Sequence, residues 1–331
     1  MTVRSLAAVA FCAGAFALPL AAQSAQCAAQ ATVLRDACQK GTDIFMMLAP
    51  QVNGALTGGG PVLGSSRSGR GLSIGVRVNA VDGHLPDPAK ITLSSNGIVK
   101  STIATKRAPV PAPTLDVAVG LFPGVFLGLE RVLSLDALLN VAYIPNRDIS
   151  DFSVKTSAGS LKLGYGARVG LLADRLFVPA VAVSFFRRSL PTATFSTSFT
   201  SSSGAISTRD SLALGDLAIE NDAIRLGVSK KLGFIEIGGG VGQDTYRTST
   251  ALHARVTPSI GPAAVGDFAL VQRIKRNAAY GSFAINVFKV RLGAEAGTTF
   301  GGDSVSTYNT FKDGKVNENR LFGSVGVRLS F

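Results

Sequence analysis

Few residues in this chain are of the types that catalyse reactions, since its 331 residues include only two histidines, His84 and His253. Asp82, His84 and Asp87 lie close together in the sequence and could form an acid–base pair, with Asp210 joining from another segment. Catalysis needs a base, a residue that orients it and a nucleophile in one cleft, and this spacing is not specific for such a cleft. The same three residues fall short of the four ligands of a typical zinc site. We therefore expect no enzymatic activity, no metal site and no cofactor.

Charged residues instead occur at alternate positions of apolar segments. In residues 161–171, Lys162 and Arg168 alternate with apolar side chains, and a period of two places alternate side chains on opposite faces of a strand. If the apolar face contacts lipid, the other face lines a lumen. Six basic and three acidic residues then point inward: Arg77, Asp116, Lys162, Arg168, Arg225, Glu236, Arg291, Glu295 and Arg328.

These inward charges allow two interpretations. In a narrow lumen they pair with one another and close it, whereas in a wider lumen the basic surplus attracts anionic solutes. Side chains nearly fill a barrel of about ten strands, which favours the first interpretation. The formal net charge of +12 also suits contact with anionic lipid headgroups. We expect no nucleic-acid partner, because the chain has no dense run of Lys and Arg and no binding motif.

The elements that would position these residues begin after an export signal. Residues 1–25 have the features of a secretory signal peptide, because Arg4 precedes an apolar run over residues 6–20 and small residues follow. The run is rich in Ala, is interrupted by Gly and Pro, and is shorter than the roughly 20 strongly apolar residues of a spanning helix. A short membrane anchor is the alternative. We expect cleavage after Ala22 or Ala25.

Cleavage would remove Cys12 and leave a pair, Cys27 and Cys38. An even pair in an exported protein favours a disulfide. One straight helix through both residues would separate them by about 16 Å, at a rise of 1.5 Å per residue, which is beyond bonding reach. Either the chain folds back between them or they stay reduced, and we expect the bond.

Alternating segments recur from residue 71 to the end. They are separated in turn by short turns, such as residues 173–175, and by long polar connections over residues 82–113, 145–157, 188–221, 247–276 and 301–318. The expected strands cover residues 71–79, 115–121, 135–144, 161–171, 177–187, 224–230, 235–246, 279–288, 290–300 and 320–331. Aromatic residues near the strand ends, among them Phe177, Phe288 and Tyr246, are typical of interfacial belts.

Two weaker strand-like pieces, residues 192–200 and 210–219, leave the strand number open between ten and twelve. Twelve results if they cross the membrane, and ten if they form a hairpin above it. Asp216 interrupts the apolar face of the second piece, so we expect ten.

The last eleven residues show the alternation most clearly, and the sequence finishes on an aromatic residue. Val325, Val327 and Leu329 share one face with Phe331. This segment resembles the C-terminal assembly signal of bacterial outer-membrane β-barrel proteins, whose barrels also combine short turns with long loops. The resemblance implies an all-β fold, a transmembrane antiparallel up-and-down barrel over residues 71–331. It further implies an outer-membrane location with both termini periplasmic, and contact with outer-membrane lipid and the outer-membrane assembly machinery. It does not indicate an oligomeric state.

Residues 26–70 precede this barrel and lie outside the alternating pattern. Thr42 is suited to cap a short apolar helix over residues 43–49, which Pro50 would end. We expect the segment to plug the barrel or to cap it on the periplasmic side. A flexible leader is the alternative, because the segment is rich in Gly and Ser.

In architecture the chain is also similar to porins and to FadL-type transporters of hydrophobic compounds, which carry an N-terminal plug before the first strand. This similarity implies a passive channel or transporter for small hydrophobic or anionic solutes. The alternative is a closed barrel that serves structure or surface interactions.

Overall fold

The computed structural model describes residues 23–58, 69, 71–87, 90–128, 130–144, 146–149, 152–157, 159–203 and 206–331. Residues 1–22, which hold nearly all of the expected signal peptide, lie outside the described residues. No helix in the described part of the chain is both long enough and apolar enough to cross a membrane.

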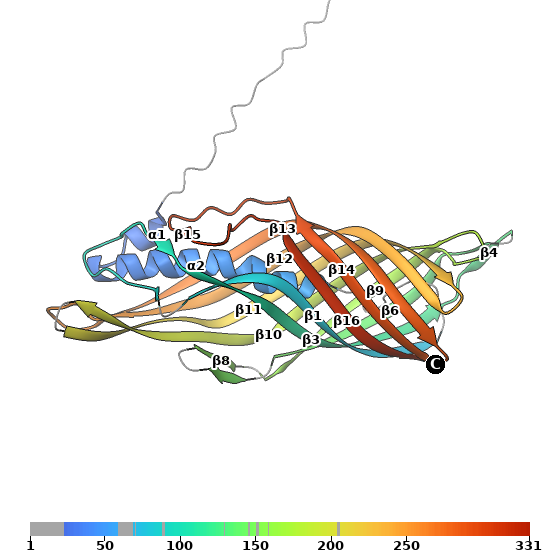
Figure 1. Ribbon diagram of the computed structural model, residues 1–331, viewed down its shortest axis with the longest axis horizontal. Coiled ribbons are helices and arrows are strands. Elements are labelled where there is room, and N and C mark those ends of the chain that lie inside the picture. The colour runs from blue at the N-terminus through green and yellow to red at the C-terminus, as the bar shows by residue number, and fades with distance from the viewer. Residues whose placement is uncertain are drawn as a thin grey trace, which may run out of the picture.

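The strands form a closed antiparallel ring (Figure 1). Twelve strands make one sheet, and two of them, β7 and β8, only extend the edge of β10 beyond β9, which leaves ten strands in the ring. The ring is complete because β10 pairs with β11, and β16 pairs with β1 with Val327 opposite Val76. The prediction of a ten-stranded antiparallel barrel is confirmed. The ring strands are β1 (Leu72–Pro86), β3 (Thr105–Phe122), β6 (Ser134–Tyr143), β9 (Leu161–Leu172), β10 (Ala180–Ser203), β11 (Ile206–Leu232), β12 (Ile235–Val256), β13 (Ala264–Val287), β14 (Val290–Phe300) and β16 (Arg320–Ser330).

Shorter strands lie at both ends of the ring. β4 (Val125–Leu127) and β5 (Glu130–Val132) form a small hairpin near the short turns. At the other end, β2 (Thr102–Ile103) and β15 (Thr310–Phe311) pair in parallel, and β7 (Arg147–Ile149) pairs with β8 (Phe152–Thr156).

Four consecutive strands, β10 to β13, are about twice as long as a membrane requires. They contain 24, 27, 22 and 24 residues, whereas a tilted spanning strand needs roughly 9–11. Most of residues 188–221 and 247–276 is therefore strand. The expected hairpin of residues 192–200 and 210–219 is present, since β10 and β11 stay paired there and the ring keeps ten strands. The prediction of a long polar connection over residues 247–276 was wrong. The cause is a reversal of the alternation, since in these parts of the strands the polar residues face outward.

Strand β12 shows the reversal within one element. In its first half Ile237 and Val241 are exposed on the outer face, while Glu236 and Asp244 are buried inside. In its second half the outward positions are mostly polar and the buried inward positions include Leu252, Ala254 and Val256. Tyr246, which we expected in an interfacial belt, points inward and is 1% exposed.

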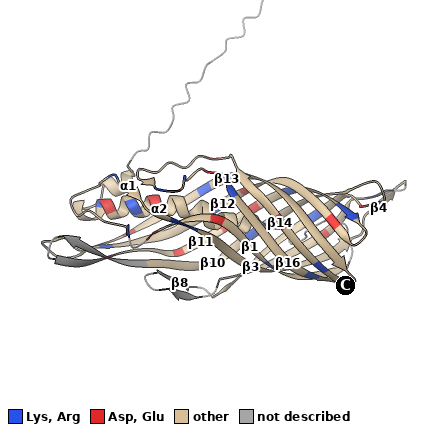
Figure 2. Ribbon diagram, viewed as in Figure 1, with Lys and Arg blue, Asp and Glu red and all other residues tan. Residues whose placement is uncertain are grey.

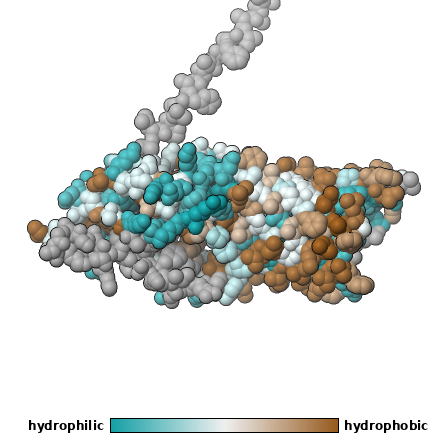
Figure 3. Space-filling model, in the orientation of Figure 1, coloured by the Kyte–Doolittle hydropathy of each residue, from teal (hydrophilic) through white to brown (hydrophobic). Residues whose placement is uncertain are grey.

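The outward apolar residues form a band around the half of the barrel that carries the C-terminus (Figure 3). Every ring strand contributes exposed apolar residues to it, among them Val76, Leu115, Leu139, Leu163, Phe185, Leu226, Val241, Phe283, Leu292, Val325, Val327 and Leu329. Phe331 is 61% exposed at the edge of the band. Such a band is the surface that a hydrocarbon layer would cover.

Inside the ring lies a helix that is much longer than we predicted. α2 covers Thr32–Thr57, so the predicted start at Thr42 and end at Pro50 were wrong. A proline inside a helix leaves the carbonyl four residues earlier without its usual partner. That carbonyl belongs to Met46, and the side-chain amide of Gln272 on β13 donates a hydrogen bond to it at 3.4 Å. The barrel wall thus supplies the bond that the helix loses.

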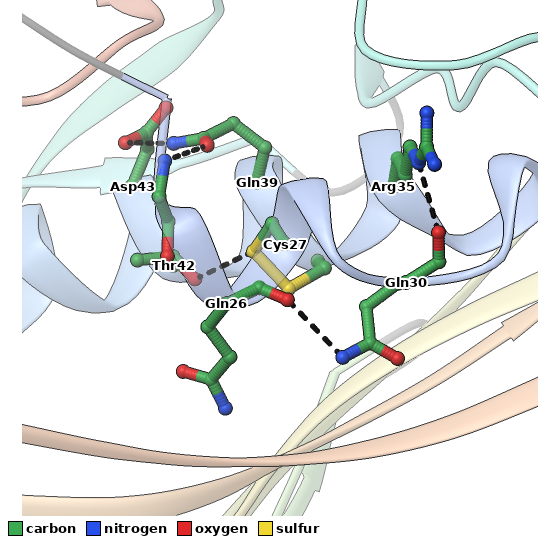
Figure 4. Close-up of a disulfide and its surroundings, with 9 residues drawn as sticks. Gln26, Cys27, Gln30, Arg35, Gln39, Thr42 and Asp43 are labelled. Carbon is green, nitrogen blue, oxygen red and sulfur yellow. Dashed lines mark hydrogen bonds between the residues drawn. A yellow bond between two sulfur atoms is a disulfide. The ribbon is translucent and has the colours of Figure 1, made fainter.

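A disulfide joins α2 to the short helix α1 (Ala25–Ala28) (Figure 4). The chain reverses over residues 29–31, which brings Cys27 and Cys38 to a Cα–Cα distance of 5.4 Å with their sulfur atoms bonded. The hydroxyl of Thr42 lies 3.7 Å from the sulfur of Cys27. The fold-back that a bond requires is therefore present.

The described N-terminal residues and the C-terminus lie at opposite ends of the barrel (Figure 1). α1 lies at the end formed by the long strands, and Phe331 lies at the end formed by the short turns. We had expected both termini on the same side. The difference arises because α2 runs along the inside of the barrel, so that the chain enters at one end and starts its first strand at the other.

Candidate functional site in the barrel lumen

Helix α2 lies in the half of the lumen that the long strands surround, and it contacts β1, β3, β11, β12, β13 and β16. Twenty of its 26 residues are buried. Charged residues of both signs are interspersed along the helix and the strands around it (Figure 2). The helix is held differently along its length, by apolar packing and loops in its first part and by polar contacts in its last part.

The first part of α2 packs in the main hydrophobic core of the molecule. Phe45 and Ala37 are fully buried there, against the inward apolar residues of the long strands. Gly41 lies so close to Leu252 of β12 that a methyl group at this position would overlap the leucine side chain. The other buried wall residues of this core are Ala142 on β6 and, on the long strands, Leu190, Leu212, Leu214, Leu217, Ile219, Ala254, Val256, Phe268 and Leu270.

Two connections cover this part of the helix and bind its charged side chains. In the connection between β1 and β3, the backbone N–H groups of Ser94 and Val99 donate to the carboxylate of Asp36, at 2.7 and 3.0 Å. Lys40 pairs with the same carboxylate at 2.8 Å and donates to the carbonyl of Thr92. The connection is therefore fastened to the helix by one buried ion pair.

The connection between β14 and β16 binds Asp43 in the same way. The backbone N–H groups of Tyr308 and Asn309 and the side-chain amide of Asn309 donate to this carboxylate at 2.7–3.1 Å. Burial raises the pKa of Asp43 above its ordinary value, and the hydrogen bonds from Asn309, Tyr308 and Gln39 offset part of that rise. A carboxylate that accepts this many N–H donors is a strong local anchor for the loop.

The last part of α2 makes polar contacts with the barrel wall. Asn53 donates to the hydroxyl of Thr248 at 3.1 Å, and the hydroxyl groups of Thr57 and Tyr246 are hydrogen bonded. Gln51 donates to the carbonyl of His84 at 3.0 Å.

Three arginines surround the C-terminal end of the helix. Arg77 donates to the carbonyl of Gly58 at 2.7 Å, Arg188 to that of Leu56 at 2.5 Å, and Arg225 to that of Thr57 at 3.3 Å. The final carbonyls of a helix lack intrahelical partners and carry partial negative charge, which cations stabilise. We call Arg77, Arg188 and Arg225 the arginine cap.

Two carboxylates form ion pairs with members of the arginine cap. Asp116 binds Arg77 at 2.7 Å and Asp244 binds Arg225 at 2.6 Å. Arg188, which is 2% exposed, instead combines its bonds to helix carbonyls with stacking over the Phe186 ring, 4.5 Å from the centroid. The negative end of α2 thus serves as the partner of the third guanidinium.

Nearer the short turns, further charges that we predicted to face the lumen are paired between strands. Arg168 binds Asp136 at 2.6 Å, and Arg291 binds Glu236 at 2.7 Å. Glu295 is also buried. Lys162, by contrast, lies exposed at the opposite end of β9 and belongs to none of these pairs.

Sequence reasoning missed Asp136, Asp244 and Arg188. Asp136 and Asp244 lie at inward positions of strands that we did expect, so the alternation could have identified them. Arg188 was missed because the strand expected over residues 177–187 stopped one residue too early, while β10 continues to Ser203.

The residues that could have formed an acid–base pair have separate partners. His84 contacts Glu318 at 3.1 Å, the carboxylate of Asp82 binds Arg107, and Asp87 lies near Lys106 at 3.2 Å. Asp210 accepts a hydrogen bond from the backbone N–H of residue 257. In the described part of the chain, His, Cys, Asp and Glu side chains do not gather in groups of three or more that could hold a metal ion.

A cavity of about 370 Å³ opens at the short-turn end of the lumen. Its charged lining comprises Asp136, Arg168, Lys231, Lys289, Arg291 and Arg328. The cavity lies beyond the arginine cap, on the side of the barrel away from α1.

A closed antiparallel ring with an apolar outer band and a charged, plugged interior is the architecture of a membrane-spanning β-barrel, and this chain has that fold. No protein-family model matches the chain, and no curated protein matches its sequence.

The solved structures that the chain resembles include two autotransporter domains and an outer-membrane channel. The translocator domain of the autotransporter NalP from Neisseria meningitidis is 14% identical with a TM-score of 0.39, over 91% of this chain and 100% of that one. The β-domain of the Bordetella autotransporter BrkA is 13% identical with a TM-score of 0.33, over 79% and 100%. The outer-membrane channel DcaP of Acinetobacter baumannii is 12% identical with a TM-score of 0.17, over 78% and 96%. At these values the similarities assign no activity, and the description of the fold rests on the ring and its apolar band.

Proposed function

We propose that the protein is a closed outer-membrane barrel whose role lies in the part that projects from the lipid, the long strands β10 to β13 packed around α2. The observation that carries the proposal is the burial of α2 within the lumen, with 20 of its 26 residues buried. A solute moving along the barrel axis would have to displace this helix from a hydrophobic core. The role is non-catalytic and structural or interactive, and it replaces the passive channel as the favoured function.

The orientation follows from the asymmetry of the connections. In barrels of this class short turns face the periplasm and long elements face the exterior. We therefore place Phe331 at the periplasmic rim and α1 on the outside of the cell. The C-terminal strand is then available to the assembly machinery, and residues 1–25, with cleavage after Ala22 or Ala25, would serve as the export signal.

A second candidate is a channel that opens when α2 withdraws. It is favoured by the polar character of the contacts at the C-terminal part of the helix, where Asn53, Thr57 and the arginine cap bind through hydrogen bonds. Water can replace such contacts at a smaller net cost than it can replace apolar packing.

Conductance of the folded protein in a planar lipid bilayer distinguishes these candidates. The closed barrel predicts no stable conductance steps for the unmodified protein. A double variant, Asn53→Cys with Thr248→Cys, would lock α2 to β12, because the two native side chains are already in contact at 3.1 Å. Conductance that disappears in the locked variant and returns on reduction would establish the moving plug and overturn the closed barrel.

The reductant also breaks the bond between Cys27 and Cys38, so the unmodified protein with reductant is the matched control. Conductance that appears in this control would show that the native disulfide itself holds the helix in place.

A further inference from the structure

The short-turn cavity contains an arginine that the fold leaves without a hydrogen bond or an ion pair. Arg328 lines the cavity on β16, and in the part of the chain that the structure describes its guanidinium makes neither kind of contact. Its electrostatic neighbours are one carboxylate, Asp116, and three guanidinium groups, Arg77, Arg168 and Arg291. Asp116, Asp136 and Glu236 each bind one of these three arginines, so the excess positive charge of the group is that of Arg328.

The carboxylate among these neighbours is already occupied. Arg77 binds both oxygen atoms of Asp116, at 2.7 and 3.2 Å, and the amide of Asn140 donates to one of them at 2.6 Å. Asp116 is 2% exposed. Little of its hydrogen-bonding capacity remains for Arg328.

The strand register makes the arrangement less favourable still. Arg291 of β14 lies directly opposite Arg328 of β16, and like charges at directly opposed positions of neighbouring strands destabilise a sheet. Glu236 binds Arg291 at 2.7 Å from the other side. On the opposite flank Arg328 faces Gly75 of β1, which offers no side chain to pair with it.

From these contacts we infer that Arg328 and Arg291 form a binding site for a small phosphate-type oxyanion that enters the lumen from the short-turn end. Two guanidinium groups can each direct paired N–H donors at such an oxyanion. The cavity of about 370 Å³ equals roughly a dozen waters at about 30 Å³ each, so a phosphate group with a small organic body fits.

The entrance favours the same class of ligand. Lys231, near the end of β11, and Lys289, on the turn between β13 and β14, line the cavity at its short-turn end. Lys289 lies over the Phe331 ring, 5.6 Å from its centroid. Basic side chains at the mouth of a low-dielectric cavity raise the local concentration of anions. The site lies on the far side of the arginine cap from α2, so it is independent of whether the helix moves.

Isothermal titration calorimetry with inorganic phosphate, on the folded protein in a non-ionic detergent at constant ionic strength, tests the site. We expect saturable binding to the unmodified protein and a loss of about tenfold or more in affinity in Arg328→Gln, since a hydrogen bond to a charged group is removed. Arg273→Gln, which removes an exposed arginine from the outer face of β13, should leave the affinity unchanged. Equal affinities in Arg328→Gln and the unmodified protein would overturn the proposal, as would the absence of saturable phosphate binding.

Thermal stability gives a readout that a purely structural role of Arg328 would not produce. Without phosphate, Arg328→Gln should keep its folded gel mobility to a higher temperature than the unmodified protein, because the repulsion from Arg291 is removed. Phosphate should raise this temperature for the unmodified protein and not for the variant. Arg328→Lys keeps the charge and loses the paired donors, so it should bind phosphate weakly. A variant that is less stable than the unmodified protein without phosphate and equally stabilised by phosphate would contradict the site.

The anion could be soluble or belong to a lipid headgroup. Repeating the titration in zwitterionic vesicles, with and without an anionic phospholipid, distinguishes these sources. Weaker apparent phosphate binding in the anionic vesicles would identify the headgroup as a competitor, and unchanged binding would identify a soluble ligand.

Discussion

The two halves of the long strands use the same alternation for opposite purposes. In the half near the short turns, residues such as Ile237 and Val241 face outward and charged residues face inward. In the half around α2, the outward positions are mostly polar and residues such as Leu252 and Phe268 face inward. The strand geometry does not change, so the location of the apolar surface is set by what lies on each side of the wall.

This difference shows which contacts stabilise each half of the barrel. A wall that faces lipid needs an apolar outer surface, and its interior can hold ion pairs because they are mutually satisfied. A wall that faces water on the outside must find its apolar partner inside, and α2 supplies that partner. The helix is therefore required by the projecting strands as much as it is enclosed by them.

The largest effect is expected from removing apolar volume between the helix and the projecting wall. Leu252→Ala should destabilise the protein by about 2–5 kcal/mol, because Leu252 is fully buried against α2 and the cavity would remain. The loss should appear as a lower temperature for the loss of folded gel mobility and as easier proteolysis of α2.

Ile237→Ala on the same strand is the matched control, since Ile237 is 47% exposed on the outer face. Lipid or detergent can fill the space there, so its effect should be clearly smaller. Equal losses in the two variants would mean that the helix is not a structural partner of the projecting wall.

An arginine on the outer face should destabilise the half near the short turns and have little effect on the half around α2. Val241→Arg places a charge in the apolar band and should cost about 2–4 kcal/mol if the position lies near the middle of the bilayer. Ser249→Arg, eight residues later on the same exposed face of β12, should have almost no effect because that face contacts water. Yield of membrane-inserted protein and urea titrations followed by circular dichroism would measure both. A similar cost for the two substitutions would move the membrane boundary beyond Ser249.

The half of the barrel near the short turns could be predicted from the sequence, whereas much of the half around α2 could not. The ring of ten strands and the inward set that includes Arg77 and Arg225 followed from one rule, apolar side out. The same rule misassigned the second half of β12, because Leu252 and Val256 alternate with polar residues in the opposite phase.

The candidate site was harder to predict because its partners are distant in sequence. Arg188 binds a carbonyl of Leu56, 132 residues away, and no local pattern connects a helix end with a particular strand position. Pro50 predicts a helix end from sequence alone, because the amide of Gln272 that replaces the missing hydrogen bond is known only from the folded barrel. Tertiary contacts therefore overrode local propensity at both places.

The smallest expected effect is a pH dependence of the protein's stability. It arises from Asp43, the α2 carboxylate that binds the connection between β14 and β16. The pKa of Asp43 is raised in the folded protein, chiefly by burial, so the folded state holds this proton more tightly than the unfolded state. Above the pKa that Asp43 has in the folded protein, its charged form lowers the free energy of unfolding. This loss of stability is reversed as the pH falls towards the ordinary pKa of 3.8. Asp43→Asn cannot titrate, so other carboxylates common to both proteins cancel in the comparison. We expect the unmodified protein to gain thermal stability relative to Asp43→Asn on acidification from neutral pH. A relative loss on acidification would instead show that the N–H groups of Tyr308 and Asn309 stabilise the charge by more than burial penalises it.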